Sequence, residues 1–384
     1  MSVVICDDDV SRIQLWIADI QAIVGDRGTV TGLTGTDLVS AVEALFERRE
    51  ASPADDAARI IDSADILIVD SDLTPDAETL KQFSTDDQQV LEDGLSGRVG
   101  ETVAYNARVR SGAKYIVVVN QGYSDRTFDL TMRRFASSVA DLYVSAADIV
   151  DPNLWDATAA DGHYQPWAWP QLASTPEKYV RARALTANLD NRVSESIGLD
   201  LSGLFAEQLD VFGDVEPNEA TFRDLAESQL GLRPKDQATS DDSKARVAAS
   251  VLLRWLDRYV VPPQNELADL AHLVLRFPRM FEAFDSVDSL QQVFETSKGP
   301  DAARSPLSEL HGRSLYSVEI IREMSRSTGT SGTSQVDAVF AEDTSRFVSY
   351  DDGVEILTAL PGSNARRFIE EVDDIRYLPR VRRL

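Results

Sequence analysis

Five short apolar segments alternate with helix-like stretches in the first 150 residues, and this alternation constrains the fold more than any other feature. The segments read SVVIC, GTVTGL, DILIVD, KYIVVVN and DLYVSA, and they begin at residues 2, 28, 65, 114 and 141. Amphipathic stretches such as VSRIQLWIADIQAI lie between them. Runs this apolar, separated by helices, predict a five-stranded parallel sheet that helices cover on both faces. Ligands of such sheets bind beyond the carboxyl ends of the strands.

Two polar insertions surround the third predicted strand, at residues 50–58 and 74–97. The second is long for a connection in a compact α/β domain, so we expect a partly helical excursion or lid there. Composition also divides the chain after the α/β domain of residues 1–150. We expect a Trp- and Pro-rich connector at 151–175, a mostly α-helical domain at 176–324, a flexible Gly/Ser/Thr linker at 325–335 and a small α+β C-terminal module at 336–384.

Charge and composition exclude several classes of function. The formal net charge of −26 argues against nucleic-acid phosphate as a partner, and no basic recognition helix is visible, so we expect no DNA binding. No run approaches the roughly 18 apolar residues of a membrane span, so we expect no membrane segment. The chain enters a strand directly, without a signal-peptide pattern, which favours the cytoplasm. Cys6 is the single cysteine, which rules out a disulfide within the chain and a cysteine metal cluster.

Carboxylates follow two of the predicted strands. Asp7, Asp8 and Asp9 follow the first strand, while Asp70 ends the third and Asp72 comes two residues later. If these strands are neighbours in a parallel sheet, the carboxylates gather at one edge. Like charges so close together raise one another's pKa or require a cation. Hard carboxylate oxygens suit Mg²⁺, so the sequence predicts an acidic pocket with Mg²⁺ as its candidate cofactor.

This arrangement resembles the receiver domain of two-component response regulators. The resemblance covers residues 1–150 and implies a flavodoxin-like five-stranded fold. VVICDDD matches the family's acidic pair, as Asp7 and Asp8 or, with a shift of one residue, as Asp8 and Asp9. ILIVDSDLTP matches the strand that carries the phosphoacceptor, which places Asp70 as acceptor and metal ligand, with a proline slightly later than usual.

Three further positions of the family pattern concern the conformational switch. Tyr143 fits the aromatic switch residue of the fifth strand. Asn120 stands where the family has a serine or threonine, and Ala146 stands where it has a lysine. Loss of the hydroxyl and the lysine removes most of the coupling between phosphorylation and conformational change. The resemblance therefore implies a degenerate receiver, or pseudo-receiver, whose chemistry is impaired.

A second phosphoryl-transfer family fits part of the same stretch. ILIVDSDLT also resembles the first motif of haloacid-dehalogenase-type phosphatases, with Asp70 as nucleophile, Asp72 as general acid/base and Thr74 as a positioning residue. The insertion 74–97 would then be the cap. That family usually carries the motif on its first strand, leaves VVICDDD unexplained, and needs a hydroxyl where Asn120 stands. The phosphatase stays open as the alternative.

Outside the acidic pocket, the sequence offers weaker candidates. Glu342 and Asp343 follow a strand-like run and would bind a metal, pair across an interface or cap a local turn. The helical segments carry no enzymatic motif, although irregular catalytic sites leave none, so an enzyme with unrecognised chemistry there is a further alternative.

The pattern as a whole favours a cytoplasmic, prokaryotic signalling protein over an enzyme. We expect an atypical response regulator or adaptor of a two-component system or phosphorelay, acting through protein–protein interaction. Its candidate partner is a histidine kinase or another signalling protein.

Overall fold

The structure is a computed structural model, and its description covers most of the chain with gaps. The described residues are 1–48, 56–120, 140–155, 171–204, 209–230, 239–261, 264–281, 285–327, 336, 338–341 and 346–349.

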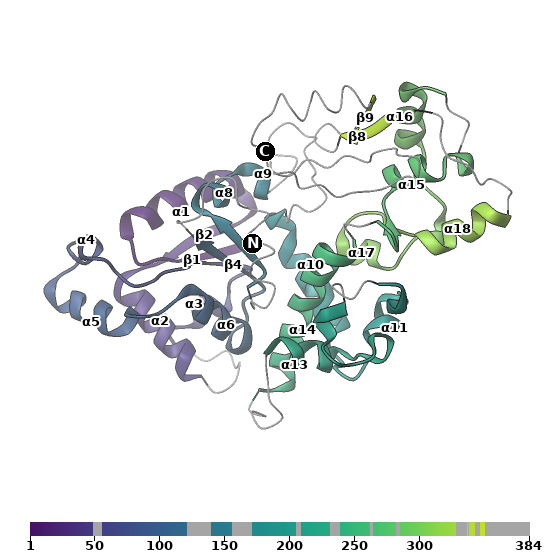
Figure 1. Cartoon of the computed structure of the whole chain (residues 1–384). Coiled ribbons are helices and arrows are strands. Elements are labelled where there is room, and N and C mark those ends of the chain that lie inside the picture. Colours follow the sequence, from purple (N-terminus) through teal and green to yellow (C-terminus); the bar gives the residue numbers. More distant parts are fainter. Residues whose placement is uncertain are drawn as a thin grey trace. The chain divides into compact units, whose positions relative to one another are not determined.

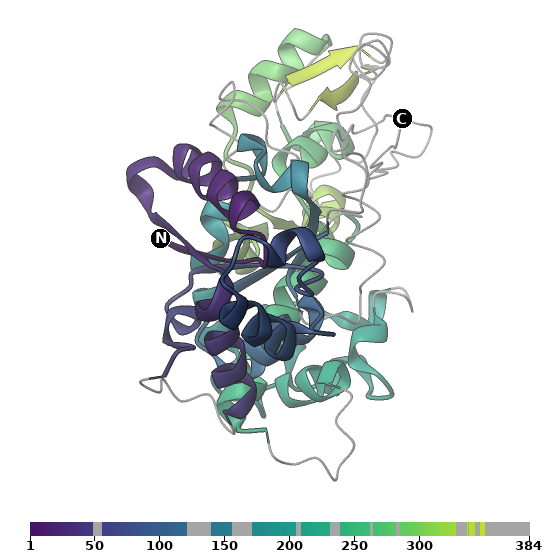
Figure 2. The same cartoon turned by 90° about the vertical axis from the view of Figure 1, so that its left-hand side faces the viewer.

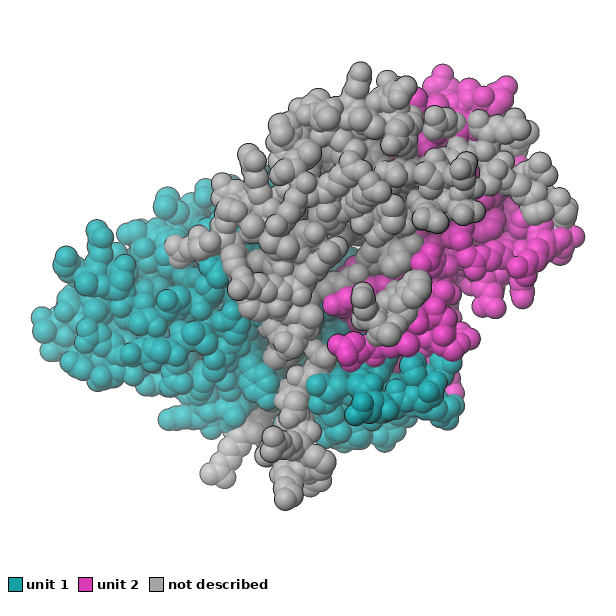
Figure 3. Space-filling view, viewed as in Figure 1, with its two compact units in different colours: residues 1–156, 170–192, 211–254 teal, residues 157–169, 193–210, 255–384 magenta. Residues whose placement is uncertain are grey.

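The chain forms two compact units, each made of several segments of sequence (Figure 3). Unit 1 comprises residues 1–156, 170–192 and 211–254. Unit 2 comprises residues 157–169, 193–210 and 255–384. The helical pattern of residues 176–324, expected as one domain, is thus divided between the two units.

Unit 1 is built on a five-stranded parallel sheet with the strand order β2-β1-β3-β4-β5 (Figure 1). This is the order of flavodoxin-like α/β folds, so the predicted parallel α/β class is confirmed. All five residues of the central strand β3 are buried, as its apolar sequence predicts, whereas β2 lies at an edge and is partly exposed. The strands are β1 Ser2–Cys6, β2 Thr29–Leu33, β3 Ile66–Asp70, β4 Tyr115–Asn120 and β5 Leu142–Ser145.

The helices of unit 1 come from both the α/β segment and the later helical pattern. They are α1 Val10–Val24, α2 Gly35–Glu47, α3 Arg59–Asp62, α4 Ala77–Leu80, α5 Thr85–Leu95, α6 Gly100–Arg110, α8 Ala146–Ile149, α9 Pro152–Trp155, α10 Thr175–Leu185, α13 Phe222–Leu230 and, reaching the boundary of unit 2, α14 Asp241–Trp255. Residues 121–139, between β4 and β5, lie outside the described residues.

Helices lie on both faces of the sheet. On one face, α2 and α6 pack against the strands, and the apolar side chains of α3 and α5 join the same core. On the other face lies α1, as Figures 1 and 2 show, and its buried residues Ile13, Trp16, Ile20 and Val24 recur at helical spacing. This arrangement leaves the carboxyl ends of β1 and β3 at one edge, beside the start of α1.

The insertion at residues 74–97 is partly helical, as predicted. It contains α4 and α5, and Leu91 and Leu95 of α5 join the core that α2 lines. A Cβ added at Gly94 would lie 2.4 Å from Cγ1 of Val39, so glycine permits the close approach of α5 to α2. Of the other insertion, at 50–58, only residues 56–58 are described.

A buried polar network joins α14 to the sheet. Asp141, which precedes β5, accepts hydrogen bonds from the backbone N–H of Ile116 (2.7 Å), from the Arg108 guanidinium of α6 and from the Ser250 hydroxyl of α14. Arg108 and Ser250 are fully buried, and Asp141 is 4% exposed. Because buried charges and polar groups need partners, this network makes α14 an integral part of unit 1, although the sequence places it in a later domain.

Unit 2 contains short helices and two small antiparallel sheets, β6-β7 and β8-β9, among its described residues. Its described α-helices are α11 Val193–Ile197, α15 Leu270–Arg276, α16 Val287–Thr296, α17 Leu307–His311 and α18 Val318–Ser327, with a π-helical turn at Leu256–Val260. Its described strands are β6 Leu267–Ala268, β7 Tyr316–Ser317, β8 Ala338–Ala341 and β9 Arg346–Ser349.

The hairpin β8-β9 packs on α16 through an aromatic cluster. The rings of Phe294, Phe340 and Phe347 meet edge to face, with centroids 5.0–5.7 Å apart. The residues expected as a separate C-terminal module therefore begin with strands that share a core with α15 and α16. Residues 350–384, and the candidates Glu342 and Asp343, lie outside the described residues.

The predicted start of the flexible linker, at residue 325, is wrong. Helix α18 continues to Ser327, and Ser325 is only 4% exposed. Val318, Ile321 and Ser325 lie on one buried face of α18. The Gly/Ser/Thr-rich composition that begins at residue 325 hides this helical pattern in the sequence. The remainder of the predicted linker, residues 328–335, is not described.

Candidate functional site

Three carboxylates meet at the carboxyl edge of the sheet. Strands β1 and β3 are hydrogen-bonded neighbours with Cys6 opposite Val69, so their ends align. Asp7 and Asp8 follow β1 and Asp70 ends β3, and each of the three offers a carboxylate oxygen within 4.8 Å of the others. Their exposed fractions are 0%, 5% and 2%. The structure thus brings together Asp7, Asp8 and Asp70, three of the carboxylates predicted to form the acidic pocket.

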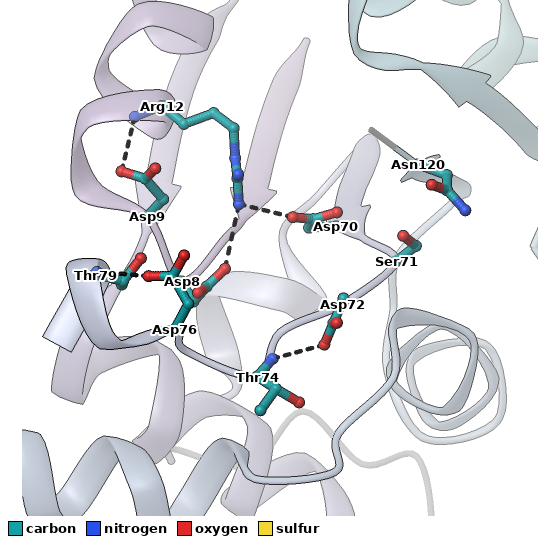
Figure 4. A pocket seen from close by; sticks show the side chains of 10 residues that line it. All are labelled: Asp8, Asp9, Arg12, Asp70, Ser71, Asp72, Thr74, Asp76, Thr79 and Asn120. Carbon is teal, nitrogen blue, oxygen red and sulfur yellow. Dashed lines mark hydrogen bonds and ion pairs between the residues drawn. The ribbon is translucent and has the colours of Figure 1, made fainter. Parts of the chain in front are cut away.

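The guanidinium of Arg12 lies among these carboxylates, and Figure 4 shows it beside those of Asp8 and Asp70. Its Nε donates to Oδ2 of Asp7 (2.6 Å) and its Nη2 to Oδ1 of the same residue (2.6 Å), which makes a two-point contact. The same Nη2 lies 2.8 Å from Oδ2 of Asp70 and 3.2 Å from Oδ1 of Asp8. One nitrogen therefore contacts all three acids. Because it carries only two hydrogens, the longest contact, to Asp8, is the weakest.

Helix α1 places Arg12 in the pocket through its first turn. Asp9 caps the helix, accepting hydrogen bonds from the backbone N–H groups of Ser11 (2.8 Å) and Arg12 (3.2 Å). This capping role commits one oxygen of Asp9 to the helix end. Arg12 then lies one turn beyond Asp8, at the i+4 spacing of helical ion pairs.

The electrostatics follow from three buried acids that share one cation. Burial and the charge of Asp7 raise the pKa of Asp8 to about 7; the charge of Arg12 opposes this rise, and the charge of Asp70 adds a smaller increase. Burial also raises the pKa of Asp7, although the hydrogen bonds and charge of Arg12 oppose the rise. For Arg12 itself, burial alone would lower the pKa, but the hydrogen bonds and charge of Asp7, followed by the charges of Asp70 and Asp8, raise it overall. The guanidinium stays charged while Asp8 holds its proton towards neutral pH.

A glycine sets the path of the chain after Asp70. The backbone N–H of Gly100, at the start of α6, donates to the carbonyl of Ser71 (2.9 Å). A Cβ at Gly100 would lie 2.1 Å from the carbonyl oxygen of Asp70. Only glycine permits this contact, so the start of α6 holds the tip of β3 from the side.

Asp72 and Thr74 form a local turn at the rim of the pocket. The carboxylate of Asp72 accepts a hydrogen bond from the backbone N–H of Thr74 (3.0 Å) and, in Figure 4, is turned towards that residue. Asp72 also forms an isolated antiparallel bridge with Val99. The pocket has a volume of about 370 Å³ and is lined by Asp8, Asp9, Arg12, Asp70, Ser71, Asp72, Thr74, Asp76, Thr79 and Asn120.

The three switch-like positions lie in different environments. Asn120 ends β4 and lines the pocket. Tyr143 in β5 is 1% exposed and belongs to the core beneath α2 and α6. Ala146 is the first residue of α8, whose N-cap Ser145 donates its hydroxyl to the carboxylate of Asp148 (2.9 Å). Ser145 stands opposite Asn120 in the sheet register, but its hydroxyl is used in the cap.

Arg12 is not among the residues predicted from the sequence, although its spacing from Asp8 is a usable signal. An arginine four residues after Asp8 has the i, i+4 spacing of a helical ion pair if the helix begins next to Asp9. Ser71, Asp76 and Thr79, which also line the pocket, were likewise not singled out. They come from the loop after β3 and the first turn of α4.

The three carboxylates would suit a divalent metal ion, whereas their contacts in the structure are made to the guanidinium of Arg12. Three buried carboxylates suit a hard ion such as Mg²⁺. In this structure, however, Arg12 contacts both oxygens of Asp7, one of Asp8 and one of Asp70. A divalent ion bound to all three acids would compete with the guanidinium for the oxygens of Asp7 and would lie beside its positive charge, so the arrangement present does not fit Mg²⁺. Magnesium binding stays a prediction that requires Arg12 to move.

Comparison of the chain with known protein families and with curated proteins finds no match. Within the described ranges, no helix combines the length and the apolar character needed to cross a membrane.

Proposed function

We propose that residues 1–150 act as a pseudo-receiver and that the chain is a signalling or adaptor protein that works through protein–protein interaction. The observation that carries the proposal is the contact of Arg12 with Asp7, Asp8 and Asp70 at the end of a sheet with flavodoxin-like strand order. It combines the acid positions of a receiver with a side chain that ties them together.

Phosphoryl transfer to Asp70 is disfavoured in this pocket for two reasons. In the reaction, an Asp70 oxygen would form a bond to phosphorus while the phosphorus–oxygen bond of the donor breaks. The oxygen Oδ2 is held by Arg12 at 2.8 Å. The neighbouring Asp7 and Asp8 bring further negative charge close to an incoming anionic phosphoryl group, which costs electrostatic energy in a buried site.

The positions that would read out phosphorylation also support a non-switching role. An amide, Asn120, replaces the expected hydroxyl, and a methyl group, Ala146, replaces the expected lysine. With neither group present, a phosphorylated Asp70 would have few contacts that differ from those of the free acid. A ligand without differential contacts cannot shift a conformational equilibrium. A partner, proposed as a histidine kinase or another signalling protein, would therefore recognise the folded α/β unit itself.

The phosphatase alternative has no supporting contact in the described residues. The proposed general acid, Asp72, accepts a hydrogen bond from the backbone of Thr74, which is the behaviour of a turn residue. The alternative still makes a distinct prediction, which is turnover of phosphate esters that depends on Asp70.

The test uses the full chain and its Asp70→Asn variant. Both are incubated with Mg²⁺ and acetyl phosphate and followed by intact mass, and both are assayed for hydrolysis of p-nitrophenyl phosphate. We expect no stable phosphoryl adduct, no Asp70-dependent hydrolysis, and a protein partner that copurifies equally with both variants. A stable adduct confined to the wild type would show a working receiver, and hydrolysis lost in Asp70→Asn would show a phosphatase.

A further inference from the structure

We infer that Arg12 is the resident cation of the acidic pocket, and that it occupies the place a divalent metal would need. The inference deepens the proposed function and rests on the same pocket. It predicts that the wild-type chain does not bind a divalent ion there, and that neutralising residue 12 creates a divalent-ion site from Asp7, Asp8 and Asp70.

The contacts of Arg12 take up both oxygens of Asp7 and one oxygen each of Asp8 and Asp70. The Nη2 nitrogen lies 2.6, 3.2 and 2.8 Å from oxygens of Asp7, Asp8 and Asp70, respectively. These three residues are the described acids that come close enough together to hold one ion. A metal bound to all three acids would have to take an Asp7 oxygen from the guanidinium or share it with a second positive charge, because both Asp7 oxygens accept from Arg12.

An aromatic ring of α1 also contacts the guanidinium. The Cζ of Arg12 lies 5.9 Å from the ring centroid of Trp16, one turn further along α1, within the range of a cation–π contact. Trp16 is 5% exposed, so the ring itself is fixed. Together with the Asp9 cap, this contact restricts the freedom of Arg12 to swing out of the pocket. The arginine is thus preorganised as part of the fold.

Competition between Arg12 and a divalent metal lowers the apparent affinity of the metal, and this decrease can be measured. If metal binding requires Arg12 to leave the pocket, the apparent affinity of the metal falls by the fraction of molecules in which the pocket is free. If that fraction is about one in a hundred, the apparent affinity is about 100-fold weaker than that of the open site. Removal of the guanidinium should recover most of the lost metal affinity.

Unit 1 offers a matched control in Arg48. Its Nη1 donates to Oδ1 of Asp62 (2.7 Å) and its Nε to Oδ2 of Asp56 (2.9 Å). Arg48 is 8% exposed. It is therefore another buried arginine between two acids, but its acids do not belong to a three-carboxylate group in the described part of the chain. Neutralising it disturbs a similar clamp without creating the proposed metal site.

The experiment titrates Mn²⁺ into the full chain and measures free Mn²⁺ by electron paramagnetic resonance. The variants are wild type, Arg12→Gln, Arg12→Gln with Asp70→Asn, and Arg48→Gln. We expect Arg12→Gln to bind one Mn²⁺ at least about tenfold more tightly than wild type. We expect the double variant to lose that site and Arg48→Gln to behave as wild type. No partner protein is needed, so failure of the adaptor proposal and failure of this inference are separate results.

A wild-type chain that binds one Mn²⁺ as tightly as Arg12→Gln, through a site lost in Asp70→Asn, would overturn the inference. Equal, weak binding by wild type and a folded Arg12→Gln would also overturn it. Thermal unfolding of the wild type decides the matter if Arg12→Gln does not fold. A Tm unchanged by millimolar MnCl₂ supports the inference, and a rise in Tm that Asp70→Asn abolishes contradicts it.

Discussion

Arg12 Nη2 lies 2.8 Å from Asp70 Oδ2, although the two residues are 58 positions apart in the sequence. The contact joins the first turn of α1 to the tip of the central strand β3. Asp7 and Asp8 bind the same guanidinium, so the pocket that resembles a phosphoacceptor site is a four-residue ionic cluster with three acids and one base. Its properties differ from those of an open acidic pocket in ways that can be measured.

Substitution Arg12→Gln should destabilise unit 1. Removing one partner of a buried ion pair leaves uncompensated charge and costs about 3 kcal/mol, at the lower end of the usual range because the Arg12 side chain is 23% exposed. The loss should be larger at pH 8 than at pH 5, since the acids left behind are protonated more readily at low pH. Urea unfolding at the two pH values measures it.

The matched control for this substitution is Arg326→Gln, at an exposed position of α18. It should change the unfolding free energy by no more than about 0.5 kcal/mol. A similarly small effect of Arg12→Gln at pH 8 would show that the ionic cluster does not stabilise the fold.

Substitution Asp8→Asn should change the pH dependence of stability. The pKa of Asp8 is raised from its ordinary value of 3.8 to about 7 in the folded chain, so the unfolded state loses this proton at lower pH than the folded state does. Asp8 therefore makes stability fall as pH rises between about 4 and 7, by at most about 1.4 kcal/mol per pH unit, and adds no further slope above that window.

Asp8→Asn removes this contribution. The variant should be more stable than wild type at pH 8 and should approach or fall below it at pH 4, as measured by urea unfolding across the range. Parallel curves for the two proteins would mean that Asp8 titrates in the folded chain as it does in the unfolded one.

Gly100→Ala tests how the tip of β3 is positioned. Helix propensity alone favours alanine by about 1 kcal/mol. The added Cβ would however lie 2.1 Å from the Asp70 carbonyl oxygen, so the backbone must shift. We expect a net loss of about 2 kcal/mol in unfolding free energy. Thr102→Ala, at an exposed position two residues further along α6, is the control. A stabilising Gly100→Ala would contradict the close approach.

Asp141→Asn tests the attachment of α14 to the sheet. An amide cannot accept from Arg108, Ile116 and Ser250 as the carboxylate does, and it leaves the fully buried Arg108 without its counter-charge. We expect a loss of about 3–5 kcal/mol. Ser250→Ala, which removes one hydrogen bond of the same network, should cost about 1 kcal/mol. Thermal or urea unfolding distinguishes the two, and equal effects would argue against the ionic contact.

The sheet and the grouping of the three acids could be predicted from the sequence because both depend on local patterns. Apolar runs separated by helices imply parallel strands, and parallel neighbours bring their carboxyl ends to one edge. That is sufficient to gather Asp7, Asp8 and Asp70. Arg12 depends in addition on where α1 begins. A start one residue later would turn its side chain by about 100° around the helix axis, and the cap by Asp9 settles the start only in the structure.

Other features escape sequence reasoning because they depend on distant partners. Arg108, Asp141 and Ser250 form one buried network, yet nothing in their local sequences connects them. Without that network, the helical pattern after residue 176 reads as a separate domain, whereas α10 and most of α14 belong to unit 1.

The central claim is that Arg12, rather than a metal, neutralises the acidic pocket. The most direct test is a crystal structure of the full chain grown with MnCl₂, with anomalous difference density measured for manganese. The account predicts no manganese peak between Asp7, Asp8 and Asp70, and a guanidinium of Arg12 in contact with all three carboxylates. A manganese peak bound by these carboxylates, with Arg12 outside hydrogen-bonding distance of Asp70, would contradict it.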